Sequence, residues 1–126
     1  MAKALGPRTN HQISFGVLAG DRAHATVIPV DLESGAFVDG PIDVQARRTM
    51  QNLRALLREA GGDLDHVVHL TVYLADAKDL AGLNAVYREF FVREPYPARA
   101  TIVARELIGP PGLRLQVSAE AYLKDE

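Results

Sequence analysis

One segment of the chain carries helix signals at both ends and an apolar stripe between them, and it constrains the fold most. Pro41 suits the first turn of a helix, because its ring already fixes φ near the helical value. Gly61-Gly62 ends the segment. Between these ends, apolar residues recur at the 3.6-residue spacing of one helix face: Ala46, Met50, Leu53, Leu57 and Ala60. We therefore predict an amphipathic helix with one buried face.

A second helix and five strands are predicted around the first helix. Asp76 can cap the N-terminus of the second helix, whose buried stripe would consist of Leu80, Leu83, Tyr87, Phe90 and Phe91. Runs rich in β-branched residues or with alternating polarity predict strands over 13–19, 22–29, 67–74, 100–103 and 113–123. Gly20-Asp21 is typical of a tight turn between the first two strands. Residues 1–12 are polar and irregular, so we expect a loosely held arm.

The resulting order, ββαβαββ, predicts an α+β domain with both helices on one face of a mixed sheet. The last predicted strand shows how the two faces would differ. Its apolar side chains would face the helices, and these are Leu115, Val117, Ala119 and Ala121. Its other side chains would face away, and these are Arg114, Gln116, Ser118, Glu120 and Tyr122. The uncovered face could be solvated or could line an interface between subunits, and a small domain of this kind is a natural oligomer.

Length and composition exclude several classes of protein. The 126 residues predict a single domain over 1–126, and a net charge of −2 without a basic run argues against a nucleic-acid surface. The N-terminus lacks the apolar core of a signal peptide, and no apolar stretch approaches the ~20 residues of a membrane span. We therefore expect a soluble cytoplasmic domain with no membrane partner. The four histidines, His11, His24, His66 and His69, lack metal-ligand spacing, so no metal and no cofactor is predicted.

Pro97-Ala98-Arg99 is the segment that points most directly to a ligand. Pro97 cannot continue the preceding helix, and Arg99 then opens a strand whose backbone is rigid. A guanidinium presents a planar fork that suits a carboxylate held by two parallel hydrogen bonds. Thr101 lies two residues further along the same strand face and could touch the same ligand. The sequence therefore predicts a small carboxylate-bearing ligand.

With these residues in place, the chain resembles the RidA/YjgF family of small enamine/imine deaminases, also called endoribonuclease L-PSP-like proteins. Individually weak motifs carry the resemblance through their order and spacing: Ala19-Gly20-Asp21, Ile28-Pro29, Gln45-Ala46-Arg47, Asn52-Leu53, Gly61-Gly62-Asp63-Leu64-Asp65-His66-Val67-Val68, Thr71-Val72-Tyr73-Leu74, Asn84-Ala85-Val86-Tyr87 and Pro97-Ala98-Arg99. The resemblance implies a chorismate-mutase-like α+β fold. It also implies a homotrimer with its clefts between subunits.

The resemblance also implies roles for particular residues. Arg99 would bind the substrate carboxylate, and Asn84 on the second helix would complete the pocket. Other family positions depart from the pattern. The family's tyrosine falls on Ile13, and its serine-glycine pair falls on Ala25-Thr26, which leaves Thr26 as a candidate contact. The family's glutamate falls on Gln116, or on Ser118 if the preceding loop is aligned two residues longer.

The missing glutamate has a chemical consequence. A glutamine can orient water but cannot accept its proton, and general-base help is typically worth ~10²–10⁴ in rate. Glu120 lies on the same strand face, but ~7 to 14 Å from the two glutamate positions at strand rise. His24 is the other acid/base candidate, because histidine titrates near neutral pH.

Three hypotheses follow for the function. The first is a protein that binds a small 2-imino or 2-keto acid, either as a divergent imine deaminase or as a specialised-pathway enzyme that reuses the pocket. The second is a non-catalytic binding or regulatory protein of the same fold. The third, RNA cleavage or translation inhibition, is disfavoured by the acidic pI near 6.1 and by the lack of a basic patch.

Overall fold

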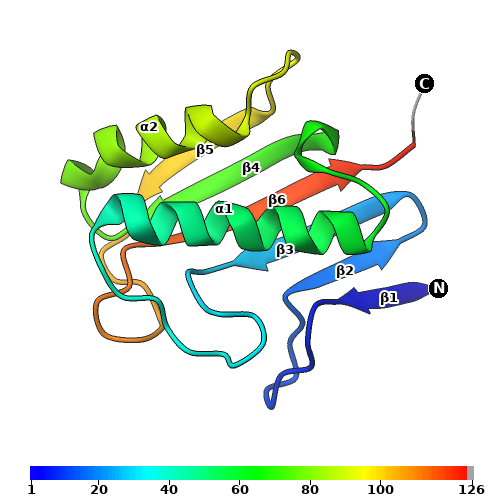
Figure 1. Ribbon diagram of the computed structural model, residues 1–126, viewed down its shortest axis with the longest axis horizontal. Helices are drawn as coiled ribbons and strands as arrows, with labels where there is room; N and C mark the ends of the chain where they lie inside the picture. Colours follow the sequence, from blue (N-terminus) through cyan, green and yellow to red (C-terminus); the bar gives the residue numbers. More distant parts are fainter. Residues whose placement is uncertain (125–126) are drawn as a thin grey trace.

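The computed structural model describes residues 1–124, in which six strands form one sheet and two α-helices cover one face of it (Figure 1). The strands are β1 (Ala2–Leu5), β2 (Gly16–Ala19), β3 (Arg22–Val27), β4 (Val67–Leu74), β5 (Ala98–Val103) and β6 (Leu115–Tyr122). The helices are α1 (Ile42–Glu59) and α2 (Leu80–Phe90), with short 3₁₀ turns at Leu64–His66 and Ala77–Asp79. Among the described residues, no helix is long and apolar enough to span a membrane.

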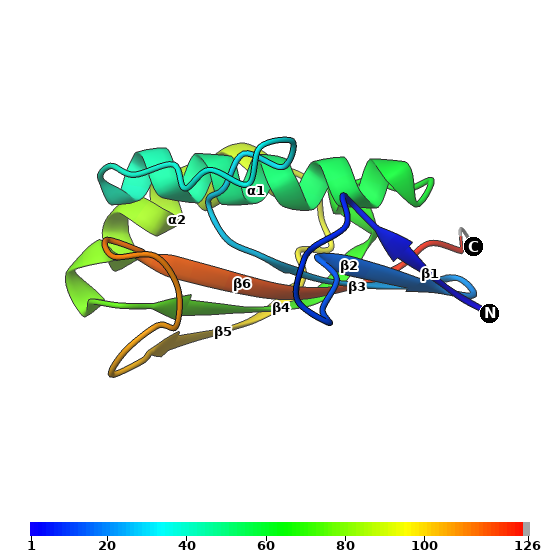
Figure 2. The ribbon, with the colours of Figure 1, turned by 90° about the horizontal axis from the view of Figure 1, so that it is seen from below.

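The sheet is mixed, as predicted. Its strand order is β1-β2-β3-β6-β4-β5, so the strand that comes last in the chain lies near the middle. All neighbouring strands are antiparallel except β4 and β5, which run parallel. Figure 2 shows the sheet edge-on with both helices on the same side of it, which leaves the other face without a covering layer. We call this uncovered surface the open face.

Helix α1 lies across the sheet as the sequence predicted. Four of the five predicted stripe residues are almost fully buried: Ala46, Met50, Leu53 and Leu57. The helix ends in a Schellman motif, in which the amide of Gly62 donates to the carbonyl of Leu57 at 2.8 Å and that of Gly61 donates to Arg58 at 3.1 Å. Gly61 adopts the left-handed backbone (φ 92°) that this ending requires. The glycine pair therefore ends the helix in the way that its sequence predicted.

Helix α2 differs from its prediction at its start. The side chain of Asp76 accepts a hydrogen bond from the amide of Lys78 at 2.9 Å, but it caps the 3₁₀ turn before α2 rather than α2 itself. Leu80 is 40% exposed, and Val86 takes its place among the buried residues with Leu83 and Phe91. Tyr87 and Phe90 are partly buried and pack against the core, so Leu80 is the one residue of the predicted stripe that is exposed.

The strands also differ from the prediction at the edges of the sheet. Residues 2–5, predicted as part of an irregular arm, form β1 and pair with β2, and Leu5 is buried. Strand β5 begins at Ala98, so Arg99 is its second residue rather than the residue that opens it. Strand β2 begins at Gly16, which leaves Ile13 in the loop that precedes it.

Strand β6 confirms the predicted alternation with one exception. Leu115, Val117, Ala119 and Ala121 are buried beneath the helices. Gln116 and Ser118 are half-buried and Glu120 is exposed on the open face. Arg114, predicted to share that face, lies before the strand, and its Nη1 reaches the two carboxylate oxygens of Asp79 at 3.2 and 3.3 Å. The ion pair with Asp79 is the reason that Arg114 turns toward the helix layer.

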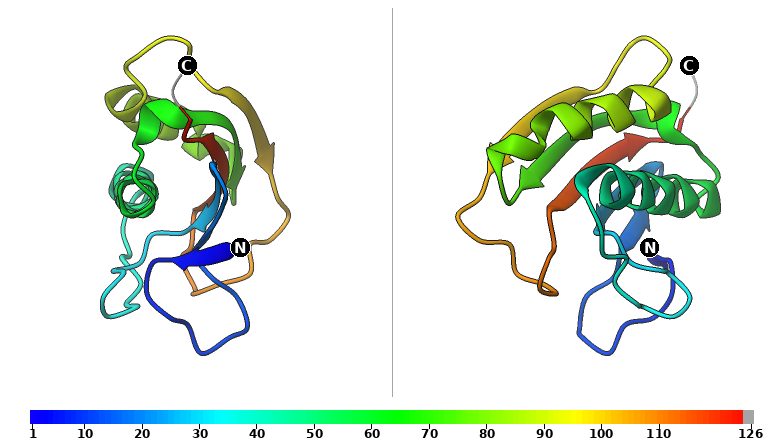
Figure 3. Two further views of the ribbon diagram at one scale, coloured as in Figure 1. Left: turned by 90° about the vertical axis from the view of Figure 1, so that its right-hand side faces the viewer. Right: turned by 60° about the vertical axis from the view of Figure 1, so that its left-hand side comes forward.

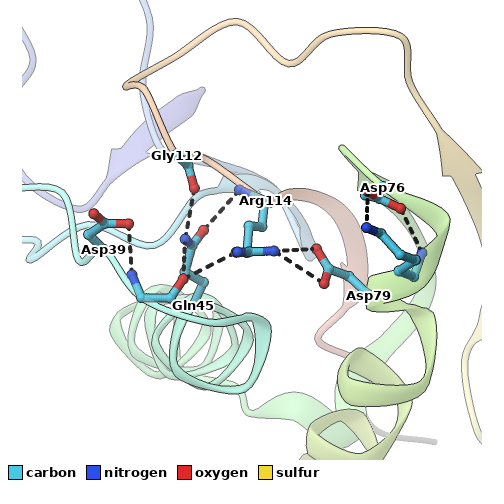
Figure 4. A network of polar contacts seen from close by, with 8 residues as sticks. Asp39, Gln45, Asp76, Asp79, Gly112 and Arg114 are labelled. Carbon is cyan, nitrogen blue, oxygen red and sulfur yellow. Dashed lines mark hydrogen bonds and ion pairs between the residues drawn. The ribbon is translucent and has the colours of Figure 1, made fainter.

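A partly buried polar network joins Arg114 to the start of α1 (Figure 4). The Gln45 side chain, which is fully buried, donates to the carbonyls of Gly40 and Gly112, both at 2.9 Å. Its Oε1 accepts the amide of Arg114 at 2.9 Å. The network therefore links the start of α1, the turn before α2 and the loop that leads into β6.

Candidate functional site

Arg99 lies on the helix face of β5, the edge strand beside β4. It is in register with Leu70, whose side chain is fully buried beneath the helices. Its Nη2 donates to Asn84 Oδ1 on α2 at 2.7 Å, and its Nε donates to Thr101 Oγ1 at 2.9 Å. The guanidinium carbon lies 4.7 Å from the centroid of the Tyr87 ring, a cation–π distance. Three residues predicted from the sequence, Arg99, Asn84 and Thr101, thus form one contact group.

The group leaves part of the guanidinium fork available. Within residues 1–124, no carboxylate lies at ion-pair distance from Arg99, and Nη1 has no hydrogen-bond partner. Burial raises the pKa of the Tyr87 phenol, against the opposing effect of the nearby Arg99 charge. The phenol therefore remains neutral at physiological pH, and its ring supports a guanidinium whose far end can receive an anion.

A hollow of about 640 Å³ adjoins Arg99, and we call it the arginine hollow. It is lined by Asn84, Tyr87, Arg88, Phe91, Val92, Tyr96 and Arg99. The first four of these residues are spaced i, i+3, i+4 and i+7, so they form one face of the end of α2. The sequence prediction placed Tyr87 only in a buried stripe and did not consider Arg88 or Tyr96. The spacing of Arg88 from Asn84, one helical turn, was the signal that could have identified it.

A second hollow, of about 810 Å³, contains the position where the resemblance expects a glutamate. We call it the glutamine hollow, because Gln116 lines it together with Thr26, Ile13 and Ile108. The loop before β2 and the loop before β6 both contribute to its lining, and both lie in the lower half of the molecule in Figure 3. Ser118 does not line this hollow and instead pairs its hydroxyl with that of Thr26 at 3.2 Å. Between the two alignments, Gln116 is the residue that faces the hollow.

His24 and Glu120 lie elsewhere on the open face. They are directly opposite each other on β3 and β6, and both line a hollow of about 310 Å³ with Arg22, Val68 and Tyr122. Neither of them lines the glutamine hollow. The two acid/base candidates are therefore separated from Gln116 within one subunit.

The residues that the resemblance brings into one pocket divide between the two sides of the sheet. Arg99 and Thr101 lie on the helix face, in register with Leu70 and Val72 of β4. Gln116 and Ser118 lie on the open face, in register with Tyr73 and Thr71 of the same strand. Within the described part of the chain, no three His, Asp or Glu side chains come together as a metal site.

The fold places the chain in the class of small α+β proteins that includes the RidA and L-PSP structures. A putative endoribonuclease of Thermotoga maritima has a TM-score of 0.88 and 27% identity, with 99% of this chain and 100% of that chain covered. The structure of Escherichia coli TdcF with bound serine has a TM-score of 0.83 and 27% identity, with 95% of this chain and 98% of that chain covered.

Sequence comparison identifies the family. The sequence model of the Endoribonuclease L-PSP family matches residues 6–123, so the chain belongs to this family, which is the RidA/YjgF family. A RutC family protein of Pyrococcus abyssi is 42% identical over 95 residues, which are 75% of this chain and 72% of that protein. The human 2-iminobutanoate/2-iminopropanoate deaminase is 35% identical over 94 residues, 75% of this chain and 66% of that protein.

Proposed function

We propose that this protein binds a small 2-oxo or 2-imino acid through its carboxylate, in clefts between the subunits of a homotrimer. One observation carries the proposal. The Arg99 guanidinium is held by Asn84, Thr101 and Tyr87, while Nη1 has no partner among residues 1–124. An arginine fixed in place by neutral groups, rather than by an acidic side chain, keeps its charge for a ligand.

The division of the predicted site between two sheet faces supports a cleft between subunits. A ligand of a few atoms cannot contact the helix face at Arg99 and the open face at Gln116 of the same subunit, because the sheet separates them. If the arginine hollow of one subunit meets the glutamine hollow of another, both groups can face one ligand. A trimer closes such a head-to-tail arrangement into a ring.

A second candidate function is hydrolysis of the bound imine, and the human relative named as a deaminase favours it. In that reaction, water adds to the carbon of the C=N bond, and the C–N bond then breaks to release ammonia and the 2-oxo acid. Gln116 can hold the water by a hydrogen bond, but its amide cannot take the water proton. We therefore propose that the protein is primarily a binding protein and that any deaminase activity is weak.

Titration calorimetry with 2-oxobutyrate tests the binding proposal. We expect saturable binding to the wild-type protein and at least a tenfold loss of affinity in Arg99→Gln, because the charged end of the fork is removed. Arg93→Gln is the matched control, since Arg93 is an exposed arginine that pairs with Asp65 at 3.4 Å outside the arginine hollow. Unchanged affinity of Arg99→Gln for 2-oxobutyrate would contradict the proposal that Arg99 binds the ligand carboxylate.

The assembly and the chemistry have separate tests. Light scattering should give about three times the 13.7 kDa mass of one chain, and a mass near 13.7 kDa would contradict the trimer. For the chemistry, an amino-acid oxidase can generate the imine of a 2-oxo acid, and release of ammonia can then be followed. An acceleration comparable to that given by the human deaminase would favour the enzyme over the binding protein.

A further inference from the structure

The arginine hollow contains a second cation that the proposed site does not use. Arg88 lines the hollow from α2, one helical turn beyond Asn84, whose Oδ1 holds Arg99. Side chains at i and i+4 lie over one another on a helix, with their Cβ atoms ~5–6 Å apart. The two guanidiniums therefore approach the same hollow from α2 and from β5.

Among residues 1–124, no acidic side chain balances these two charges. The residues that line the hollow include two arginines, one amide and four apolar or aromatic side chains, but no Asp or Glu. Arg88 has no ion pair or hydrogen bond through its side chain within residues 1–124. Its sequence neighbour Glu89 points to α1, where it pairs with Arg47 at 2.8 Å. A hollow with two unbalanced positive charges attracts a dianion more strongly than a monoanion.

The dimensions of the hollow fit a short diacid. About 640 Å³ is ample for a ligand of four or five carbons, and the part of the Arg99 guanidinium left free by Thr101 and Asn84 has room for only one carboxylate. The Tyr87 and Phe91 rings, stacked at 4.5 Å between centroids, lie in the same wall and can contact the carbon chain between two acidic ends.

From these observations, and resting on the proposed function, we propose that the ligand is a 2-oxo or 2-imino diacid. Arg99 holds its first carboxylate, and Arg88 holds the second. Arg88 is then the residue that selects diacids over the monoacids of similar length. Because Arg88 is exposed, its contribution is a modest charge-assisted contact that salt weakens.

Calorimetry with 2-oxobutyrate and 2-oxoglutarate tests the inference on the full chain. At low ionic strength we expect the wild-type protein to bind the diacid about fivefold more tightly, and the preference to shrink as salt is added. Arg88→Gln should abolish the preference, because it should weaken binding of 2-oxoglutarate more than binding of 2-oxobutyrate. Arg93→Gln should keep the preference, which controls for a general loss of positive charge.

The outcomes separate this inference from the function on which it rests. Equal affinity of the wild-type protein for both acids, or a diacid preference that survives in Arg88→Gln, would overturn the role of Arg88 while leaving the carboxylate site at Arg99 intact. Failure of both acids to bind would overturn the proposed function and the diacid selection with it. A thermal melt of Arg88→Gln distinguishes loss of selection from loss of folding.

Discussion

Arg99 and Gln116 project from opposite faces of one sheet. Arg99 is in register with Leu70 on the helix face, and Gln116 is in register with Tyr73 on the open face, so their register positions lie three residues apart along β4. In the proposed trimer, one subunit would therefore present Arg99 and Gln116 to different neighbouring subunits. This relationship makes the assembly, rather than the single chain, the unit whose chemistry has to be tested.

The first prediction concerns the missing carboxylate. Gln116→Glu should raise the rate of imine hydrolysis by about 10²-fold or more, because a carboxylate can accept the proton of the attacking water. Ammonia release from an oxidase-generated imine measures the rate. Ser118→Glu is the control, since Ser118 faces Thr26 and does not line the glutamine hollow. An equal gain in both variants would show that the hollow does not define the reacting position.

The second prediction concerns the ring beneath the arginine. Tyr87→Leu should weaken binding of 2-oxobutyrate about two- to fivefold, because the cation–π contact that helps to orient Arg99 is worth about 0.5–1 kcal/mol at such a site. Tyr87→Phe keeps the ring and should bind as the wild type does. If the two variants bind equally well, the ring has no part in holding Arg99.

The third prediction concerns the buried amide at the start of α1. Gln45→Leu should lower the free energy of unfolding by roughly 3 kcal/mol, because the carbonyls of Gly40 and Gly112 and the amide of Arg114 lose their partner. Urea denaturation measures the change. Gln51→Leu, at an exposed position of the same helix, should change it little. A small effect at Gln45 would mean that water replaces the amide at no great cost.

The fourth prediction concerns acid stability. Burial opposes ionisation of Asp63, but the hydrogen bond from the Leu64 amide and the Arg58 charge outweigh it and hold the pKa of Asp63 below 3.8. The unfolded chain therefore takes up this proton first as the pH falls. The stabilising contribution of the carboxylate is present above pH 3.8 and is lost as the pH falls through the folded-state pKa.

Asp63→Asn tests this assignment, because asparagine keeps the ability to cap a helix and loses the charge. The wild-type protein should have a larger free energy of unfolding than the variant at pH 7, and this difference in free energy should become smaller below pH 3.8. Thermal melts across this range measure the difference. A gap that stays constant with pH would mean that the carboxylate charge is not the source of the stabilisation.

Most of the architecture could be predicted because its signals are local. The stripe from Ala46 to Leu57, the glycine pair after α1 and the alternation along β6 each depend on residues close in sequence. Strand β1 could not be predicted, because the four residues Ala2–Leu5 have no strong β pattern and are ordered by pairing with β2. Its existence depends on a tertiary contact rather than on its own propensity.

The candidate site could be predicted only in part. The sequence identified Arg99, Asn84 and Thr101, and the structure brings them into contact. It could not show that Gln116 lies across the sheet from them, because the face of Arg99 is set by the parallel register of β5 against β4. Arg114 was assigned to the open face because strand alternation does not account for an ion pair with Asp79.

The central position of β6 bears on how the protein is made. Residues 115–122 form β6, which pairs with β3 on one side and with β4 on the other. The β1-β2-β3 part of the sheet is therefore not joined to the β4-β5 part until β6 has been synthesised. During synthesis from the N-terminus, the chain must leave the ribosome as far as Tyr122 before the core can close. Nascent chains stalled before Leu115 should therefore remain protease-sensitive, with the edges of β3 and β4 available for incorrect pairing until the final strand inserts between them.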